Sequence, residues 1–170
     1  MAQLVPIEMV ADAAVEDLLD QAFGRDRHAR TAYRLRAGTR ALPDLSFALV
    51  GDTGLLGSIQ CWPVRFDGDD GISQPLVLVG PVAIAPAHQH GGLGRQLMQA
   101  MLSAADAQVL DLMLIGDPEY YGRFFGFTAG ATGGWRLPGP VERHRLLARG
   151  ATVPHGAGTL RPRVDVAAVA

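Results

Sequence analysis

Hydrophobic positions recur at helical spacing in three stretches of the chain. From Ala11 to Phe23 apolar residues recur every three to four positions and Gly24 follows, which predicts a helix that ends at this glycine. From about Ala29 to Ala37 a second stretch stops at Gly38. From Leu93 to Gln108 apolar residues recur at four-residue intervals and describe one face of a longer helix.

Strand-like runs fill the first half of the chain between the predicted helices. Gln3 to Met9 has the pattern of a short strand. The runs Leu45 to Val50 and Leu55 to Trp62 flank a turn rich in Gly and Asp, which predicts a hairpin. A second Asp- and Gly-rich break precedes the longest run, Pro75 to Ile84. We expect the last three strands to form an antiparallel meander.

The pattern changes after the meander. Leu110 to Ile115 is a short apolar run, typical of a buried strand that lies parallel to its predecessor across the long helix. Asp117-Pro118-Glu119 supplies a helix N-cap, a proline suited to the first helical position and an early acid, so a short helix is expected to end near Gly126. Beyond Phe127 only weak strands are predicted, the best at Arg145 to Arg149. The fold class is therefore α/β (α+β) with a mixed sheet.

Length and charge narrow the function. A chain of 170 residues with 48% hydrophobic and 19% charged residues is expected to be one globular domain spanning 1–170. The net charge is -2, and all 15 basic residues are Arg, which argues against nucleic-acid binding.

The single Cys61 excludes an internal disulfide and fits a reducing compartment. The first ten residues carry no basic side chain and no apolar run reaches membrane length, so we expect a cytoplasmic protein without a membrane partner.

A glycine-rich turn follows the longest predicted strand and leads into the long helix. Backbone N–H groups at a helix start have no carbonyl partner within the helix and attract anions, and Gly91, Gly92 and Gly94 let a phosphate approach closely. A Walker A loop would need a Lys, where Arg95 stands. A Rossmann fingerprint would need Gly or Ala where Leu97 stands, and its acidic partner is missing.

A third pattern fits better. The order Val82-Ala83-Ile84 followed by Gln89-x-x-Gly92-x-Gly94 resembles the acetyl-CoA signature of the GNAT superfamily of N-acetyltransferases. The segments Gly116 to Tyr121 and Gly126-Phe127 resemble the second half of that signature, and the pattern is most similar to the small YhbS-like branch. The resemblance is most specific over Leu76 to Phe127.

The resemblance implies a GNAT-like fold that binds acetyl-CoA as cosubstrate, with no metal. Pro81 cannot donate to a strand ladder, so a gap is expected beside it, and in the family such a gap between splayed parallel strands takes the pantetheine arm. The cofactor-binding set implied in this way runs along the strand and the turn: Val82, Ala83, Ile84, Gln89, His90, Gly91, Gly92, Leu93, Gly94 and Arg95.

The resemblance also implies a tyrosine that protonates the departing thiolate. The reference pKa of Tyr is about 10 and that of a thiol about 8.5, so a phenol holds its proton where a thiolate needs one. Tyr121 is the first choice and Tyr120 the second. The spacing departs from the usual pattern, because Tyr121 stands five positions before Gly126 instead of four. No acid lies within Val77 to Ile84, where some members carry a general base, so a water relay or an amine of low pKa would have to replace it.

Several features have more than one interpretation. His88 and His90 are expected to be surface residues rather than metal ligands, and Cys61 a small buried residue. The arginines at 30, 34 and 36 either line an acceptor entrance or form a solvated face. Trp135 and Pro138 to Pro140 either wall the acceptor site or form a rigid surface loop.

The expected function is transfer of an acetyl group to a primary amine, directly within a ternary complex. The alternative is a module of the same fold that binds or senses CoA without turnover. The acceptor is a small molecule or a peptide. The sequence does not decide between a monomer and a homodimer.

Overall fold

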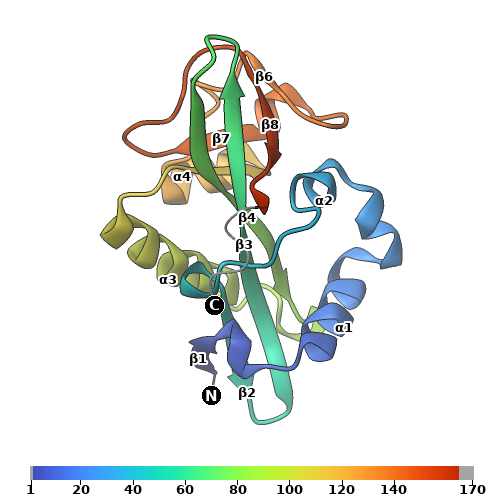
Figure 1. Ribbon diagram of the computed structural model, residues 1–170. Helices are drawn as coiled ribbons and strands as arrows, with labels where there is room; N and C mark the ends of the chain where they lie inside the picture. The colour runs from blue at the N-terminus through green and yellow to red at the C-terminus, as the bar shows by residue number, and fades with distance from the viewer. Residues whose placement is uncertain (1, 165–170) are drawn as a thin grey trace. The chain divides into compact units, whose positions relative to one another are not determined.

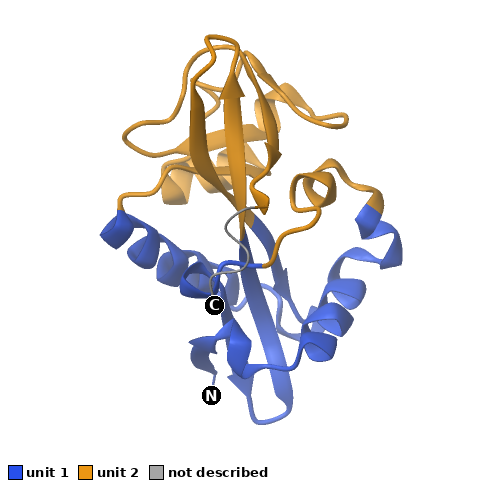
Figure 2. Ribbon diagram, viewed as in Figure 1, with its two compact units in different colours: residues 1–28, 41–61, 80–108 blue, residues 29–40, 62–79, 109–170 orange. Residues whose placement is uncertain are grey.

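The computed structural model describes residues 2–164, which form two compact units (Figure 2). Unit 1 contains residues 1–28, 41–61 and 80–108, and unit 2 contains residues 29–40, 62–79 and the chain from 109 onward. Strands β3 (Gly54–Gly68) and β4 (Ser73–Ile84) each contribute residues to both units. The expectation of a single domain over 1–170 stays a prediction, and its last six residues lie outside the described ones.

Unit 1 is built on the first strands of the chain. β1 (Gln3–Pro6) pairs antiparallel with β2 (Phe47–Gly51), and β2 pairs antiparallel with the start of β3. The prediction of a strand as far as Met9 is wrong past Pro6, because residues Ile7–Met9 form a 3-10 turn closed by the Val10 N–H on the Ile7 carbonyl at 3.0 Å. The predicted hairpin between β2 and β3 is confirmed.

Two helices flank the strands of unit 1 on opposite sides (Figure 1). α1 (Asp12–Phe23) ends at Gly24 and α3 (Leu93–Gln108) occupies its whole predicted range, so both predictions are confirmed. The core beneath them consists of Leu19, Ile59, Leu97, Met98 and Met101, all fully buried. Arg27 is also buried in this unit, where it pairs with Glu16 and with Asp20 at 3.4 Å, so its charge is compensated.

The helix predicted from Ala29 to Ala37 is shorter in the structure. A 3-10 segment (Arg25–Ala29) is followed by an extended Arg30, and α2 covers only Thr31–Leu35. The Thr31 hydroxyl donates to the Pro140 carbonyl at 2.6 Å, which holds the helix start on a loop far along the chain. This contact has no local sequence signal. Further 3-10 turns lie at Pro43–Leu45, Pro86–His88 and Arg143–Arg145.

Unit 2 combines parallel and antiparallel pairs. β4 pairs parallel with β5 (Leu112–Ile115) at Val77–Leu112 and Leu78–Met113, and β5 pairs antiparallel with β7 (Leu146–Arg149). The hydrogen-bonded strand order is β1-β2-β3-β4-β5-β7, which confirms the predicted mixed sheet and its strand–helix–strand crossover. The parallel pairing of β4 with β5 stops at Leu78, two residues before Gly80-Pro81, in agreement with the expected end of pairing beside Pro81.

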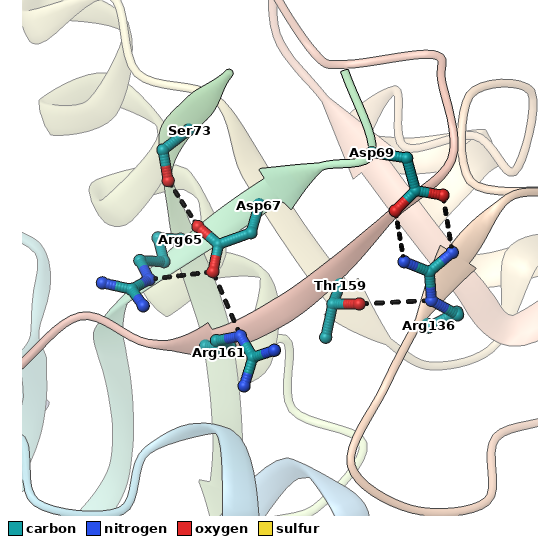
Figure 3. Close-up of polar contacts among 7 residues, drawn as sticks. All are labelled: Arg65, Asp67, Asp69, Ser73, Arg136, Thr159 and Arg161. Carbon is teal, nitrogen blue, oxygen red and sulfur yellow. Dashed lines mark hydrogen bonds and ion pairs between the residues drawn. The ribbon is translucent and has the colours of Figure 1, made fainter. Parts of the chain in front are cut away.

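The sequence does not predict β6 (Trp135–Arg136) or β8 (Gly158–Pro162). β8 pairs antiparallel with the second half of β3 and parallel with β6. One ion pair joins β3 to β8: Asp67 contacts Arg161 at 3.1 Å, and within β3 it also contacts Arg65 at 3.2 Å (Figure 3). The Ser73 hydroxyl donates to Asp67 and is the main reason that the pKa of this carboxyl is lowered.

Trp135 belongs to the core of unit 2. Its side chain is fully buried, its ring lies 5.5 Å from that of Phe66, and its indole N–H donates to the Pro154 carbonyl at 3.1 Å. Both sequence interpretations of Trp135, as a wall of the acceptor site and as part of a surface loop, are therefore replaced by a packing role.

Candidate active site

The glycine-rich turn and the start of α3 form the exposed end of unit 1. The first helical hydrogen bond runs from the Gln96 N–H to the Gly92 carbonyl at 3.2 Å, so the N–H groups of the preceding residues have no carbonyl partner inside the helix. His90 and Gly92 have left-handed backbone conformations, with φ of 70° and 81°. The turn therefore presents main-chain donors at the positive end of a helix of 16 residues.

Gly92 leaves open space at this turn. A Cβ built on Gly92 would meet no heavy atom within 4 Å, although its φ of 81° is one that side-chain-bearing residues rarely adopt. A phosphate can approach the backbone through the space that a side chain would otherwise fill. The turn thus combines open space at Gly92 with main-chain donors at the helix start.

The end of β4 lies in the same unit as the turn. Val82 and Ile84 are half-buried and Ala83 is buried, and the Ala85 N–H donates to the Leu56 carbonyl at 2.8 Å. A Cβ on Gly57 of β3 would lie 2.8 Å from Cδ1 of Ile84. β3 therefore packs closely against the end of β4 at Gly57, where the Ala83 carbonyl oxygen would lie 3.1 Å from the same Cβ.

All ten residues of the predicted cofactor set thus lie in unit 1, on the end of β4, the glycine-rich turn and the start of α3. Gln89 to Gly92 and Arg95 are exposed, while Leu93 and Gly94 are half-buried. Among residues 2–164 no three His, Cys, Asp or Glu side chains gather to form a metal site. None of the described helices is both long and apolar enough to cross a membrane.

Tyr121 lies on α4 (Pro118–Phe125) in unit 2. Asp117 caps the helix by accepting the Glu119 N–H at 3.0 Å, as predicted. The helix ends at Gly126, which has a φ of 76°, and the Phe127 N–H donates to the Tyr121 carbonyl at 3.2 Å. The cap at Asp117 places Tyr121 at the end of the first helical turn, where its N–H donates to the Asp117 carbonyl at 2.9 Å.

Aromatic rings surround the Tyr121 side chain. Its ring lies 4.9 Å from that of Tyr120 in an edge-on arrangement, 6.3 Å from Phe125 and 6.4 Å from Phe127. Burial, and next the neighbouring Tyr120, raises the pKa of Tyr121 to about 12. The phenol therefore stays protonated across the neutral range, as a proton donor must.

The Arg36 side chain does not belong to a solvated face, which was one of the two interpretations of the arginines in the second predicted helix. Its guanidinium lies 3.9 Å from the ring centre of Tyr33 and 4.0 Å from that of Trp62, so it stacks between two aromatic side chains of unit 2. Arg34 donates to the Pro138 carbonyl at 2.9 Å. Neither contact has a sequence signal, because the partners lie 26 and 104 positions away.

Comparison with known proteins identifies the class of protein that carries this strand, turn and helix. Residues 12–127 match the model of the Acetyltransferase (GNAT) family. Because that match covers well over half of the chain, the protein belongs to this family. No curated protein sequence matches the chain significantly.

Two solved structures share the fold over nearly the whole chain. The GNAT family N-acetyltransferase YhbS from Escherichia coli, in complex with CoA, is 21% identical, with a TM-score of 0.70 over 100% of this chain and 93% of that one. A GNAT family acetyltransferase from Brucella melitensis, in complex with acetyl-CoA, is also 21% identical, with a TM-score of 0.66 over 98% of each chain. The fold is therefore that of YhbS, in agreement with the branch indicated by the sequence.

Proposed function

We propose that this protein is an N-acetyltransferase that moves an acetyl group from acetyl-CoA to a primary amine, directly within a ternary complex. The observation that carries the proposal is the glycine turn before α3, where the open space at Gly92 adjoins the main-chain donors of the helix start. Family membership and the CoA and acetyl-CoA complexes of the two similar proteins support it. The acceptor is a small molecule or a peptide.

The turn and the end of β4 have separate roles in this proposal. The main chain of His90 to Arg95, with Gln89 before it, holds the pyrophosphate at the helix start. The main chain of Val82 to Ile84 pairs with the amides of the pantetheine arm. Both segments lie in unit 1, so one unit supplies the whole proposed cofactor set.

The transfer itself forms one bond and breaks another. The neutral amine attacks the thioester carbonyl carbon, the carbon–sulfur bond breaks, and the amine nitrogen loses a proton. Tyr121 gives its hydroxyl proton to the departing sulfur and regains one from the nitrogen through solvent. Because no acid lies within Val77 to Ile84, the amine has to arrive uncharged or pass its proton to water.

An acyl-enzyme on the single cysteine does not fit the structure. Cys61 is fully buried, and burial raises the pKa of its thiol far above the neutral range. The thiolate is the nucleophilic form, so this thiol is unreactive. Direct transfer avoids the need for a protein nucleophile.

A thermal-shift titration with acetyl-CoA and CoA tests the binding step. Wild type is expected to gain melting temperature as ligand concentration rises, and Gly92→Asp is expected to lose this gain. Gly71→Asp is the matched control, because Gly71 has a φ of 87° and equally open space at the tip of the β3–β4 hairpin. No shift for wild type at millimolar ligand contradicts the proposal.

The alternative function, a module that binds CoA without turnover, is favoured by the absence of an acid within Val77 to Ile84. A thiol-release assay with a panel of amines separates the two functions. Amine-dependent release of CoA supports the enzyme. A wild-type protein that binds acetyl-CoA but releases no thiol with any amine supports the module.

A further inference from the structure

Two buried polar side chains of β3 each have an oxygen without a hydrogen-bond partner. Ser58 is fully buried and Gln60 is 9% exposed. Neither the Ser58 hydroxyl oxygen nor the Gln60 amide oxygen has a hydrogen-bond partner among the described residues. A buried polar atom without a partner is destabilising, so each of these two oxygens calls for an explanation.

The two side chains lie on the same face of β3. Side chains alternate along a strand, so positions 58 and 60 face one way and positions 57, 59 and 61 face the other. A Cβ on Gly57 would lie 3.2 Å from Cδ1 of Leu97, which places the odd-numbered positions toward α3. Ser58 and Gln60 therefore face away from α3, on the side of the strands where Figure 1 shows α1.

This face adjoins the end of β4 to which the proposed function assigns the pantetheine arm. The Ala85 N–H donates to the Leu56 carbonyl, which sets the register between β4 and the neighbouring β3. Two positions from this pair along each antiparallel strand, Ser58 of β3 lies beside Ala83 of β4. Ala83 shares a buried cluster with Val15, Leu18 and Leu19 of α1. The unpartnered oxygens therefore lie next to the proposed thioester strand within unit 1.

Charged side chains that pack near this face include Arg36, whose guanidinium lies 4.0 Å from the ring centre of Trp62, two positions along β3 from Gln60. Glu16 and Asp20 of α1 are both engaged by the buried Arg27, so Ser58 and Gln60 offer uncharged acceptors. An ammonium ion has three N–H donors and a charge that burial penalises. A neutral primary amine has two N–H donors and one lone pair, which matches two neutral oxygens.

We propose that Ser58 and Gln60 form the subsite for the acceptor's amino group. Each oxygen accepts one N–H of an uncharged primary amine, and the lone pair is left free to attack the thioester. This subsite selects primary over secondary amines, because a secondary amine leaves one buried oxygen without a donor. The inference rests on the proposed acetyl transfer and deepens it by naming the residues that recognise the acceptor.

The test compares Ser58→Ala and Gln60→Leu with matched controls on the exposed side of α3, Ser103→Ala and Gln99→Leu. The probes are primary amines, each paired with its N-methyl derivative. Wild type and both controls are expected to prefer the primary amine at least tenfold in kcat/KM. Each β3 variant is expected to lose most of that preference through a higher KM for the primary amine, and to keep wild-type affinity for acetyl-CoA.

Thermal stability supplies a second readout that a purely structural role would move in the opposite direction. Replacing an unpartnered buried polar group with an apolar one of similar shape is expected to raise the melting temperature. Lower melting temperatures with an unchanged amine preference overturn the inference. A lower kcat at unchanged KM also overturns it, since it points to a bound water rather than to the amine. If wild type itself does not bind acetyl-CoA, the proposed function is contradicted instead.

Discussion

The ring of Tyr121 occupies the space that any side chain at Gly116 would need. A Cβ built on Gly116 would lie 2.5 Å from Cε2 and 2.8 Å from Cδ2 of Tyr121. Gly116 is buried directly after β5, and its N–H donates to the Arg145 carbonyl at 2.9 Å. The glycine therefore sets the position of the tyrosine that we propose as proton donor.

Gly116→Ala is expected to displace the Tyr121 ring and to lower kcat by roughly tenfold to a hundredfold, because a misplacement of about 1 Å is enough for such a loss. The affinity for acetyl-CoA is expected to stay within about twofold, since the proposed cofactor set lies in unit 1. Steady-state kinetics and thermal-shift titration measure the two effects. Gly130→Ala is the control, because a Cβ there meets only an ordinary contact at 3.6 Å. Unchanged kcat in Gly116→Ala would contradict the placement.

Tyr121→Phe is expected to lower kcat by roughly a hundredfold to ten-thousandfold, the usual contribution of a positioned proton donor, at unchanged affinity for acetyl-CoA. Tyr120→Phe, on the same helix turn, is the matched control and is expected to retain most activity. If Tyr120→Phe instead lost the activity and Tyr121→Phe kept it, the second choice from the sequence would replace the first. Loss in neither variant would remove both tyrosines from the mechanism.

The raised pKa of Tyr121 predicts a specific loss of stability in alkali. Its pKa is about 12 in the folded protein, whereas an unfolded chain releases the proton near pH 10. Stability from this group is therefore complete below about pH 10 and is lost as pH rises toward about 12, by at most about 3 kcal/mol. Urea unfolding of wild type and Tyr121→Phe over this range measures it. Parallel curves for the two proteins would contradict the raised pKa of Tyr121.

The sequence predicts the elements whose signals are local. The helix Leu93–Gln108 follows from its four-residue apolar repeat, and α4 follows from Asp117 at its start and Gly126 at its end. The strand–turn–helix order likewise predicts which residues form the proposed cofactor segment. In each case the residues that carry the signal are close in sequence to the element that they predict.

Features that depend on distant partners could not be predicted in the same way. β8 is a strand because it pairs with β3, almost a hundred positions earlier, and the second predicted helix is shortened where Thr31 donates to Pro140. Ser58 and Gln60 look like ordinary polar residues in a strand until the structure shows both to be buried. Burial and long-range hydrogen bonds are properties of the fold, and no short sequence pattern carries them.

Gly57→Ala tests whether the end of β4 is part of the proposed cofactor site. The new Cβ would lie 2.8 Å from Cδ1 of Ile84, 3.1 Å from the Ala83 carbonyl oxygen and 3.2 Å from Cδ1 of Leu97. The Ile84 side chain can rotate away, but Leu97 is fully buried and the Ala83 oxygen is backbone, so the remaining crowding is expected to shift β4 slightly against β3. We expect a loss of about 1–3 kcal/mol in the free energy of unfolding, as for other overpacked cores.

The same shift is expected to weaken acetyl-CoA binding at least tenfold, because the main chain of Val82 to Ile84 would no longer align with the pantetheine amides. Urea unfolding at several acetyl-CoA concentrations separates the two effects, since only the ligand-dependent part reports the affinity. Gly133→Ala, at an exposed position with no heavy atom within 4 Å of the new Cβ, is the control for the substitution itself. A destabilised Gly57→Ala with wild-type affinity would exclude β4 from the cofactor site, because the strand would then have moved without any consequence for the ligand.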